Sequence, residues 1–168
     1  MKKFLLAVGV IFLAASSLKA QNKLAGQALH VSLGAEGSLP LGKFNQAGYN
    51  FGVGGSLQVE YKRFSDFGMF LNGGFITFSQ KSGLGGRGFS FVPVSAGFKY
   101  YFVPGTYAQL AVGAAFRTTY GGGTNFIYSP GIGFNVTHKL DALIKFTGFT
   151  GSVNYSALGL RLAYNFGK

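Results

Sequence analysis

The sequence contains no cysteine and only two histidines. Without cysteine the chain cannot form a disulfide, and it cannot be anchored as a lipoprotein through a lipidated cysteine. Two histidines with no thiolate offer no recognisable set of metal ligands. We therefore expect no disulfide, no metal site and no bound cofactor.

Charged residues are scarce, and acidic residues are the scarcest. Charged residues make up 11% of the chain, with only four acids, whereas an ordinary soluble domain carries about 25% charged residues. Aromatic residues reach 17%, and there are 28 glycines. This composition indicates an outer surface that meets lipid. The basic excess does not predict nucleic-acid binding, because the basic residues are dispersed and the chain reads as exported.

Long apolar runs are absent except near the N-terminus, where residues 1–20 read as a cleaved Sec signal peptide. Lys2 and Lys3 precede an apolar core, and small residues lead to a predicted cleavage after Ala20. The core spans 12 residues, against roughly 20 for a membrane-spanning helix, so an uncleaved anchor is only the alternative. Cleavage leaves residues 21–168 as one domain and lowers the formal net charge from +11 to +8.

After the signal, apolar residues alternate one for one with small or polar residues. Within residues 51–62, Val53 and Leu57 fall on one face of an extended chain, while Ser56 and Glu60 fall on the other. An open sheet would leave backbone groups unpaired in hydrocarbon, so strands can cross a bilayer only as a closed barrel. The alternation in an exported chain therefore predicts a membrane-spanning β-barrel.

We predict an all-β fold, an eight-stranded antiparallel up-and-down transmembrane β-barrel. The strands are expected over residues 28–39, 50–62, 67–79, 88–102, 106–118, 127–138, 140–149 and 155–166. Short connections alternate with longer ones at 40–49, 80–87 and 119–126, and the last hairpin is short. Outer-membrane barrels have short periplasmic turns and longer external loops, so both termini are expected in the periplasm.

Two further features bear on the barrel wall. Pro93 and Pro130 lie inside or near strands, where a ladder hydrogen bond must be lost, and we place them at bulges or near the rim. Aromatic residues gather at strand ends and predict a periplasmic girdle at the level of the lipid headgroups. The members expected in this girdle are Tyr61, Phe64, Phe67, Tyr100, Tyr101, Phe102, Tyr107, Tyr164 and Phe166.

Several charged residues occupy the inward-facing positions of the alternation. They form a predicted polar cluster of the lumen: His30, Glu36, Glu60, Lys62, Lys99, Arg117, Lys145 and Arg161. Side chains can fill a barrel of eight strands, and buried charges must pair or stay wet. We expect a polar plug with Glu36 and Glu60 beside Lys or Arg. The alternative is a narrow anion-selective channel, because inward cations outnumber inward acids.

Three segments of this chain resemble a known family, the small outer-membrane β-barrel domain proteins of Gram-negative bacteria, often called porin-family barrels. The segments are Leu39-Pro40-Leu41-Gly42-Lys43-Phe44, residues 93–102, and Arg161-Leu162-Ala163-Tyr164-Asn165-Phe166. The resemblance covers essentially all of residues 21–168. It implies a non-enzymatic outer-membrane protein and an aromatic-ended last strand recognised during assembly. Here Gly167 and Lys168 follow Phe166, so that terminal signal is slightly displaced.

Other function classes were weighed against this interpretation. His30, Ser32 and Glu36 share a face, and a hydroxyl, a base and an orienting acid are what acyl hydrolysis needs, so a lipid A-modifying barrel hydrolase is one alternative. A soluble barrel of the lipocalin type, with its apolar face inward, is another. Residues 83–88 match G-x-G-x-x-G, but a strand follows instead of a helix, so they read as a loop.

The expected partners follow from this location. Outer-membrane lipid, lipopolysaccharide and the barrel assembly machinery are expected to meet the chain, which is predicted to be a monomer. Lys43, Lys81 and Arg87 lie in predicted external loops, where they are ordinary solubilising charges or attract lipopolysaccharide phosphates. The predicted role is therefore structural, or is surface contact made through these loops.

Overall fold

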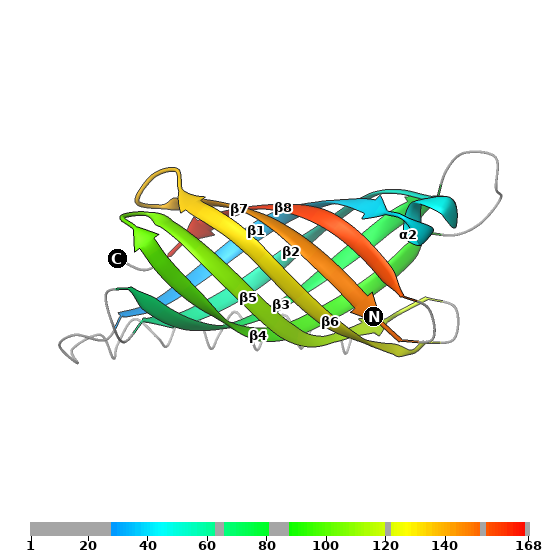
Figure 1. Cartoon of the computed structure of the whole chain (residues 1–168), viewed down its shortest axis with the longest axis horizontal. Helices are drawn as coiled ribbons and strands as arrows, with labels where there is room; N and C mark the ends of the chain where they lie inside the picture. The colour runs from blue at the N-terminus through cyan, green and yellow to red at the C-terminus, as the bar shows by residue number, and fades with distance from the viewer. Residues whose placement is uncertain (1–27, 63–65, 81–87, 120–121, 152–153, 167–168) are drawn as a thin grey trace, which may run out of the picture.

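The computed structural model describes residues 28–62, 66–80, 88–119, 122–151 and 154–166. It is a closed barrel in which consecutive strands pair antiparallel and the last strand returns to the first (Figure 1). The strands are β1 (Ala28–Leu41), β2 (Tyr49–Lys62), β3 (Phe67–Gln80), β4 (Phe89–Val103), β5 (Thr106–Arg117), β6 (Thr124–Asn135), β7 (Leu140–Thr150) and β8 (Tyr155–Asn165). The predicted all-β, eight-stranded up-and-down barrel is confirmed.

One short helix, α2 (Lys43–Gln46), interrupts the connection between β1 and β2, where the sequence predicted only a loop. Within the described part of the chain, no helix has the length and apolar character needed to cross a membrane. The predicted signal peptide, Lys81 and Arg87 lie outside the described residues.

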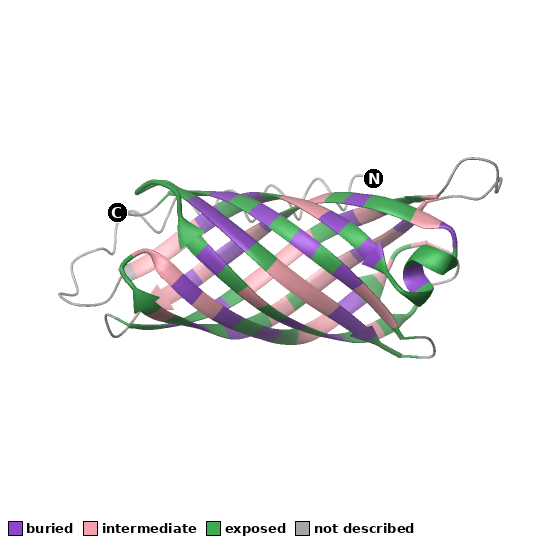
Figure 2. Cartoon of the chain, turned by 45° about the horizontal axis from the view of Figure 1, so that its top comes forward, coloured by how far each residue is buried: buried purple, intermediate pink, exposed green. Residues whose placement is uncertain are grey.

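Side-chain burial alternates along much of the barrel wall, as the sequence predicts (Figure 2), although β7 departs from the pattern with three consecutive buried residues, Asp141, Ala142 and Leu143. Leu71 and Ile132 are 65% and 62% exposed on the outside, while Ser56 and Lys99 are buried inside. A lipocalin-like barrel would have the opposite arrangement, so the structure excludes that alternative. The other large apolar side chains that lie exposed on strands include Leu33, Val53, Phe75, Phe98, Leu110, Val112, Phe134, Ile144, Leu160 and Leu162.

The two ends of the barrel differ. One end, here called the helix end, has α2 and the connections 42–48, 81–88, 118–123 and 151–154. The other, the turn end, has the connections 63–66, 104–105 and 136–139. The predicted alternation of longer and shorter connections is thus present, with α2 folded against the mouth of the helix end (Figures 1 and 2).

The sixth strand is displaced from its predicted position, because it ends at Asn135 and not at residue 138. Thr137 closes a tight turn instead: its hydroxyl accepts hydrogen bonds from the backbone N–H groups of Lys139 (3.2 Å) and Leu140 (3.1 Å). A threonine hydroxyl that bonds to nearby backbone in this way competes with the strand ladder. His138 therefore lies exposed in the turn.

Pro93 and Pro130 were expected at bulges or near the rim, and the register shows no bulge at either residue. Pro130 stays in register with Leu110 of β5, but its pairing with β7 is interrupted and resumes at Gly131 opposite Lys145 without a shift. Proline has no N–H to donate to one neighbour. Beside Pro130, the Ser129 hydroxyl donates to the Phe146 carbonyl oxygen at 3.0 Å, which supplies a bond across this gap.

The predicted aromatic girdle needs one correction. Tyr100, Phe102 and Tyr164 do lie exposed on the outside near the turn end. Tyr101 and Tyr107, in contrast, point into the lumen, where both hydrogen-bond to carboxylates. The tyrosines at these two positions differ from the girdle members only in strand parity, which decides whether the hydroxyl meets headgroups or buried charge.

Candidate functional site

Three of the four acidic residues in the chain face the lumen, and each lies beside a basic residue. The first is Glu36 on β1. Its Oε2 accepts a hydrogen bond from Lys145 Nζ of β7 at 2.8 Å, and its Oε1 lies 3.9 Å from Arg161 Nε of β8. The register brings Glu36 opposite Arg161, so closure of the barrel creates this contact.

The second acid is Glu60 on β2, at the turn-end side of the lumen. Lys99 Nζ donates to its Oε2 at 2.9 Å, and the Tyr101 hydroxyl donates to its Oε1 at 2.7 Å. Lys62 does not join this ion pair, and its ammonium lies 3.8 Å from the centre of the Tyr101 ring. Both oxygens of the Glu60 carboxylate are therefore satisfied by strongly polar donors.

The third acid is Asp141 on β7. The Tyr107 hydroxyl donates to its carboxylate, with distances of 2.9 and 2.8 Å to the two oxygens. Arg161 Nη1 lies 3.7 Å from Asp141 Oδ1. Lys99 Nζ lies 4.3 Å from the centre of the Tyr107 ring, so this tyrosine also connects the Glu60 pair to Asp141.

Arg161 is the most enclosed of the charged side chains, with 1% of its surface exposed. Its Nε donates to Ser56 Oγ at 2.9 Å and its Nη2 donates to Ser32 Oγ at 3.0 Å. Gly34 makes room for it, because a Cβ atom at that position would lie 2.7 Å from Arg161 Nε. The guanidinium can therefore lie flat across β1 between two carboxylates.

These charged groups and their two tyrosines form one connected set, which we call the ionic network: Glu36, Glu60, Lys99, Tyr101, Tyr107, Asp141, Lys145 and Arg161. Burying an unpaired charge is costly, whereas these acids and bases neutralise one another. An arrangement with three acids and three bases presents no net charge to attract an ion of either sign.

The structure brings together five of the eight residues predicted for the lumen cluster, namely Glu36, Glu60, Lys99, Lys145 and Arg161. Lys62 stacks on Tyr101 at the edge of the ionic network. Arg117 lies at the helix end, where its Nε donates to the Gly122 carbonyl oxygen at 2.7 Å. His30 faces the lumen opposite Glu60 in the register, but within the described part of the chain it makes no hydrogen bond or ion pair that joins it to the ionic network.

Sequence reasoning missed three members of the ionic network. Asp141 lies at the start of the predicted strand 140–149 but was not counted among the inward charges, and Tyr101 and Tyr107 were assigned to the girdle. A signal was present, since Asp141 has the same strand parity as Lys145. Strand parity by itself would have predicted an inward-facing Asp141 carboxylate. It would then lie among the inward lysines and arginines, which outnumbered the inward acids that were predicted.

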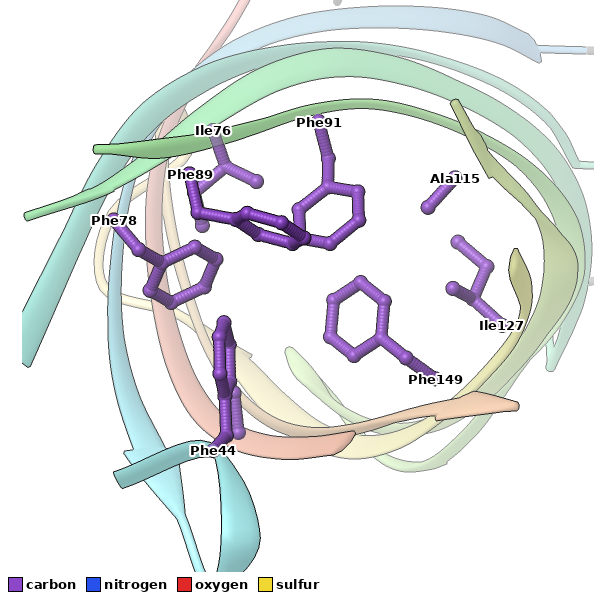
Figure 3. Close-up of a cluster of buried hydrophobic side chains, with 9 residues drawn as sticks. Phe44, Ile76, Phe78, Phe89, Phe91, Ala115, Ile127 and Phe149 are labelled. Atoms are coloured by element: carbon purple, nitrogen blue, oxygen red, sulfur yellow. The ribbon is translucent and has the colours of Figure 1, made fainter. Parts of the chain in front are cut away.

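The helix-end half of the lumen contains a cluster of aromatic and apolar side chains, which we call the aromatic stopper. It comprises Phe44, Ile76, Phe78, Phe89, Phe91, Ala115, Ile127, Phe149 and Ala157 (Figure 3). Tyr49 and Tyr155 pack against it. The rings of Phe91 and Phe149 stack with centroids 5.0 Å apart, and Phe44 of α2 meets Phe78 edge to face at 4.7 Å. Such geometries are the favoured ones for aromatic pairs.

The prediction of a polar interior is therefore wrong for this half of the barrel. The sequence did contain a sign of it, because Phe70 and Phe78 share a face with Asn72 in β3. Apolar side chains are stable here because the barrel is narrow. Aromatic rings that converge from several strands exclude water from one another, and this burial of apolar surface is favourable.

A cavity of about 50 Å³ separates the ionic network from the aromatic stopper. Lys145 and Glu36 line one side of it, while Phe149 and Ile127 line another. Its remaining polar lining includes Asn72, Ser95, Gln109, Ser129 and Thr147.

The structure gives no support to a hydrolase arrangement at the start of the barrel. The Ser32 hydroxyl accepts a hydrogen bond from Arg161, and no hydrogen bond between described residues joins it to His30. A serine nucleophile needs a base within hydrogen-bonding reach. Among the described residues, no group of three potential metal ligands is present either. Residues 83–87 of the glycine-rich motif lie outside the described residues.

No protein-family model and no curated protein matches the sequence. Solved structures match in fold. One is the attachment invasion locus protein Ail of Yersinia pestis, with a TM-score of 0.59 and 17% sequence identity. The match covers 85% of this chain and 100% of the Ail chain. The N-terminal β-barrel domain of Pseudomonas aeruginosa OprF has a TM-score of 0.58 at 17% identity, over 82% of this chain and 97% of that one.

A de novo designed transmembrane β-barrel also matches, with a TM-score of 0.53 and 15% identity over 85% of this chain and 98% of the design. At these identities the likeness concerns the backbone and not the residues that line the lumen. The chain therefore has the fold of a small transmembrane β-barrel of the outer-membrane type.

Proposed function

We propose that this protein is an integral β-barrel of a Gram-negative outer membrane, exported by the signal Met1–Ala20, without enzymatic activity and with a closed lumen. The observation that supports this most is the inside-out distribution of side chains. Large apolar residues such as Leu33, Leu110 and Leu162 lie exposed, whereas Glu60 and Arg161 are buried. Water would disfavour that arrangement, and a bilayer favours it.

The height of the apolar surface fits a bilayer. Outward residues of β1 run from Leu29 to Leu41. A strand rises about 3.3 Å per residue and tilts by about 40° in a barrel, so this row spans on the order of 30 Å along the axis. Outer-membrane barrels present an apolar band about 25 Å tall with aromatic girdles beyond it.

The experiment that tests this location is fractionation of cells that express the full chain. We expect the mature protein in the outer-membrane fraction, and we expect unheated samples in detergent gels to migrate differently from boiled ones, because the closed barrel resists the detergent. Recovery in the soluble fraction, or identical migration before and after boiling, would contradict the proposal.

A closed lumen distinguishes this proposal from a small anion-selective channel. Support for a closed lumen comes from the ionic network in the turn-end half and the aromatic stopper in the helix-end half. In planar bilayers we expect little steady conductance from the purified protein. Regular single-channel steps would instead favour the channel.

A lipid A-modifying hydrolase makes a separate prediction that can be tested on its own. It would release fatty acid from lipid A, and Ser32→Ala would abolish that release. We expect no release from either protein.

The role that remains is structural or interactive, through the helix end facing the outside. Lys43 is exposed on α2, and Lys81 and Arg87 follow in a later connection. We propose that these basic side chains meet lipopolysaccharide phosphates. The Ail barrel has been solved in complex with the heparin analogue sucrose octasulfate, an anion that Ail binds. We expect a monomer, inserted by the barrel assembly machinery, whose binding to lipopolysaccharide vesicles weakens when Lys43→Glu reverses the charge.

A further inference from the structure

Several polar side chains line the cavity between the ionic network and the aromatic stopper. Gln109 lines it and is 8% exposed, and its Oε1 accepts no hydrogen bond from any described group. Lys145 also lines it and donates to Glu36, which uses one of the three N–H bonds of its ammonium. A buried acceptor and spare donors therefore face the same space.

These unused groups indicate what the cavity takes. An unsatisfied buried polar group costs about 1–3 kcal/mol, so a molecule that completes its hydrogen bonds is held favourably. A water needs about 10–15 Å³ of such volume and two to four polar partners, and a cavity of about 50 Å³ offers both to several waters. Because Glu36 and Lys145 neutralise each other, the cavity suits small neutral polar molecules and not ions.

The aromatic stopper lies against the cavity on its helix-end side. Phe149, Ile76 and Ile127 belong both to the cavity lining and to the stopper. Every other member of the stopper is on a strand, and Phe44 alone is on α2 (Figure 3). Strand residues belong to the hydrogen-bonded ladder of the barrel, whereas Phe44 lies outside the ladder and packs its ring against the stopper.

The segment that bears Phe44 is a short helix between two glycines. Phe44 is completely buried, whereas Lys43, Asn45 and Gln46 of the same helix are exposed. Glycines flank the helix on both sides in the left-handed region, Gly42 with φ of 51° and Gly48 with φ of 85°. Such backbone conformations suit glycine, and a short helix between two of them has the form of a hinged lid.

We propose that the cavity is a binding site for small neutral polar molecules, water first, and that α2 is its lid, with Phe44 as the part that opens. This deepens the proposed function and depends on the lumen being closed. Displacement of Phe44 leaves space beside Phe78 and Phe149, into which these rings move. The cavity then communicates with the medium at the helix end.

The absence of native cysteine allows a direct test on the full barrel, purified in detergent. Ser95→Cys places one thiol in the cavity lining with almost no change of shape. We would measure the rate at which this thiol reacts with methyl methanethiosulfonate, a small neutral reagent. The rate in Ser95→Cys alone is compared with the rate in Ser95→Cys combined with Phe44→Ala. Asn154→Cys, exposed at the helix end, is the matched control.

We expect Phe44→Ala to speed the reaction of Cys at position 95 at least tenfold and to leave the control rate unchanged. Equal rates at position 95 in the two backgrounds would overturn the lid. If Phe44→Ala does not fold, Phe44→Leu replaces it and is expected to give a smaller acceleration in the same direction. Because the barrel is assayed in detergent, this result does not depend on where the protein resides in the cell.

The occupant of the cavity is tested separately by solution NMR of the unaltered protein in detergent. We expect a cross-relaxation signal between water protons and the side-chain amide of Gln109. Absence of that signal, with the signals of exposed side-chain amides present, would overturn the water site. A conducting barrel in planar bilayers would refute the closed lumen of the proposed function, whereas equal thiol reaction rates in a non-conducting barrel would refute the lid alone.

Discussion

Glu36 and Lys145 are 109 residues apart in the sequence, and their side chains form an ion pair of 2.8 Å in the lumen. They come from β1 and β7, which are separated by β8. Gly159 of β8 lies opposite Lys145 in the register, and a Cβ atom there would be 3.3 Å from Lys145 Cγ and Cε. The glycine leaves the inner surface of β8 clear, so the lysine passes over it to reach Glu36.

Replacement of Glu36 by glutamine should destabilise the barrel, because it leaves Lys145 and Arg161 with less compensating negative charge. Breaking a buried ion pair costs about 3 kcal/mol or more. The free energy of unfolding can be measured by urea titration in lipid vesicles with circular dichroism, since the chain has no tryptophan. Asp66→Asn, at the exposed acid, is the control and should change stability little. Equal effects of the two substitutions would argue against the ionic network.

Removal of the Tyr107 hydroxyl by Tyr107→Phe should also weaken the barrel. The hydroxyl donates to the carboxylate of Asp141, and a hydrogen bond to a charged group contributes about 1.5–3 kcal/mol. Tyr100→Phe removes a hydroxyl from an exposed ring on the same part of the wall and should have little effect. Thermal unfolding of the two variants would separate them, and a shift for Tyr100→Phe as large as that for Tyr107→Phe would contradict the assigned facing.

An arginine on the outer surface tests the contact with lipid. Leu110 is 52% exposed near the middle of β5, so Leu110→Arg should cost about 2–4 kcal/mol in vesicles. Val103→Arg, on the outside at the turn end, should cost about 0–1 kcal/mol because it lies at the interface. The comparison is made by reversible unfolding in the same lipid. A water-exposed outer surface would show no difference between the two sites.

Two outward-facing glycines give a matched pair for packing on the wall. At Gly148 a Cβ atom would lie 2.3 Å from the Tyr128 ring, whereas at Gly73 no atom lies within 4 Å. Gly148→Ala should therefore displace Tyr128 and cost about 1–3 kcal/mol, as overpacking does. Gly73→Ala should be neutral or slightly stabilising, because it restricts the unfolded chain. A reversed order in urea titrations would show that Tyr128 does not cover Gly148.

Strand parity was the part of the site most open to prediction. The alternation in β1 and β8 turned Glu36 and Arg161 inward, and the structure has both facing the lumen. It did not identify Asp141, because a residue beside a turn can be read as part of the connection. It also misplaced the end of β6, because local bonds of Thr137 compete with the ladder over a few residues.

The sequence by itself determined which side of the wall each residue occupies, and with it the closed barrel. The reason is that a side-chain period of two is a local property of the extended chain, and closure is the only way to pair its edges in lipid. The tertiary structure decided which inward residues meet. Contacts such as Lys99 with Glu60 and Phe44 with Phe78 depend on register, on the height of each residue along the axis, and on a connection that folds back over the mouth. These are properties of the closed sheet as a whole, which no single strand encodes.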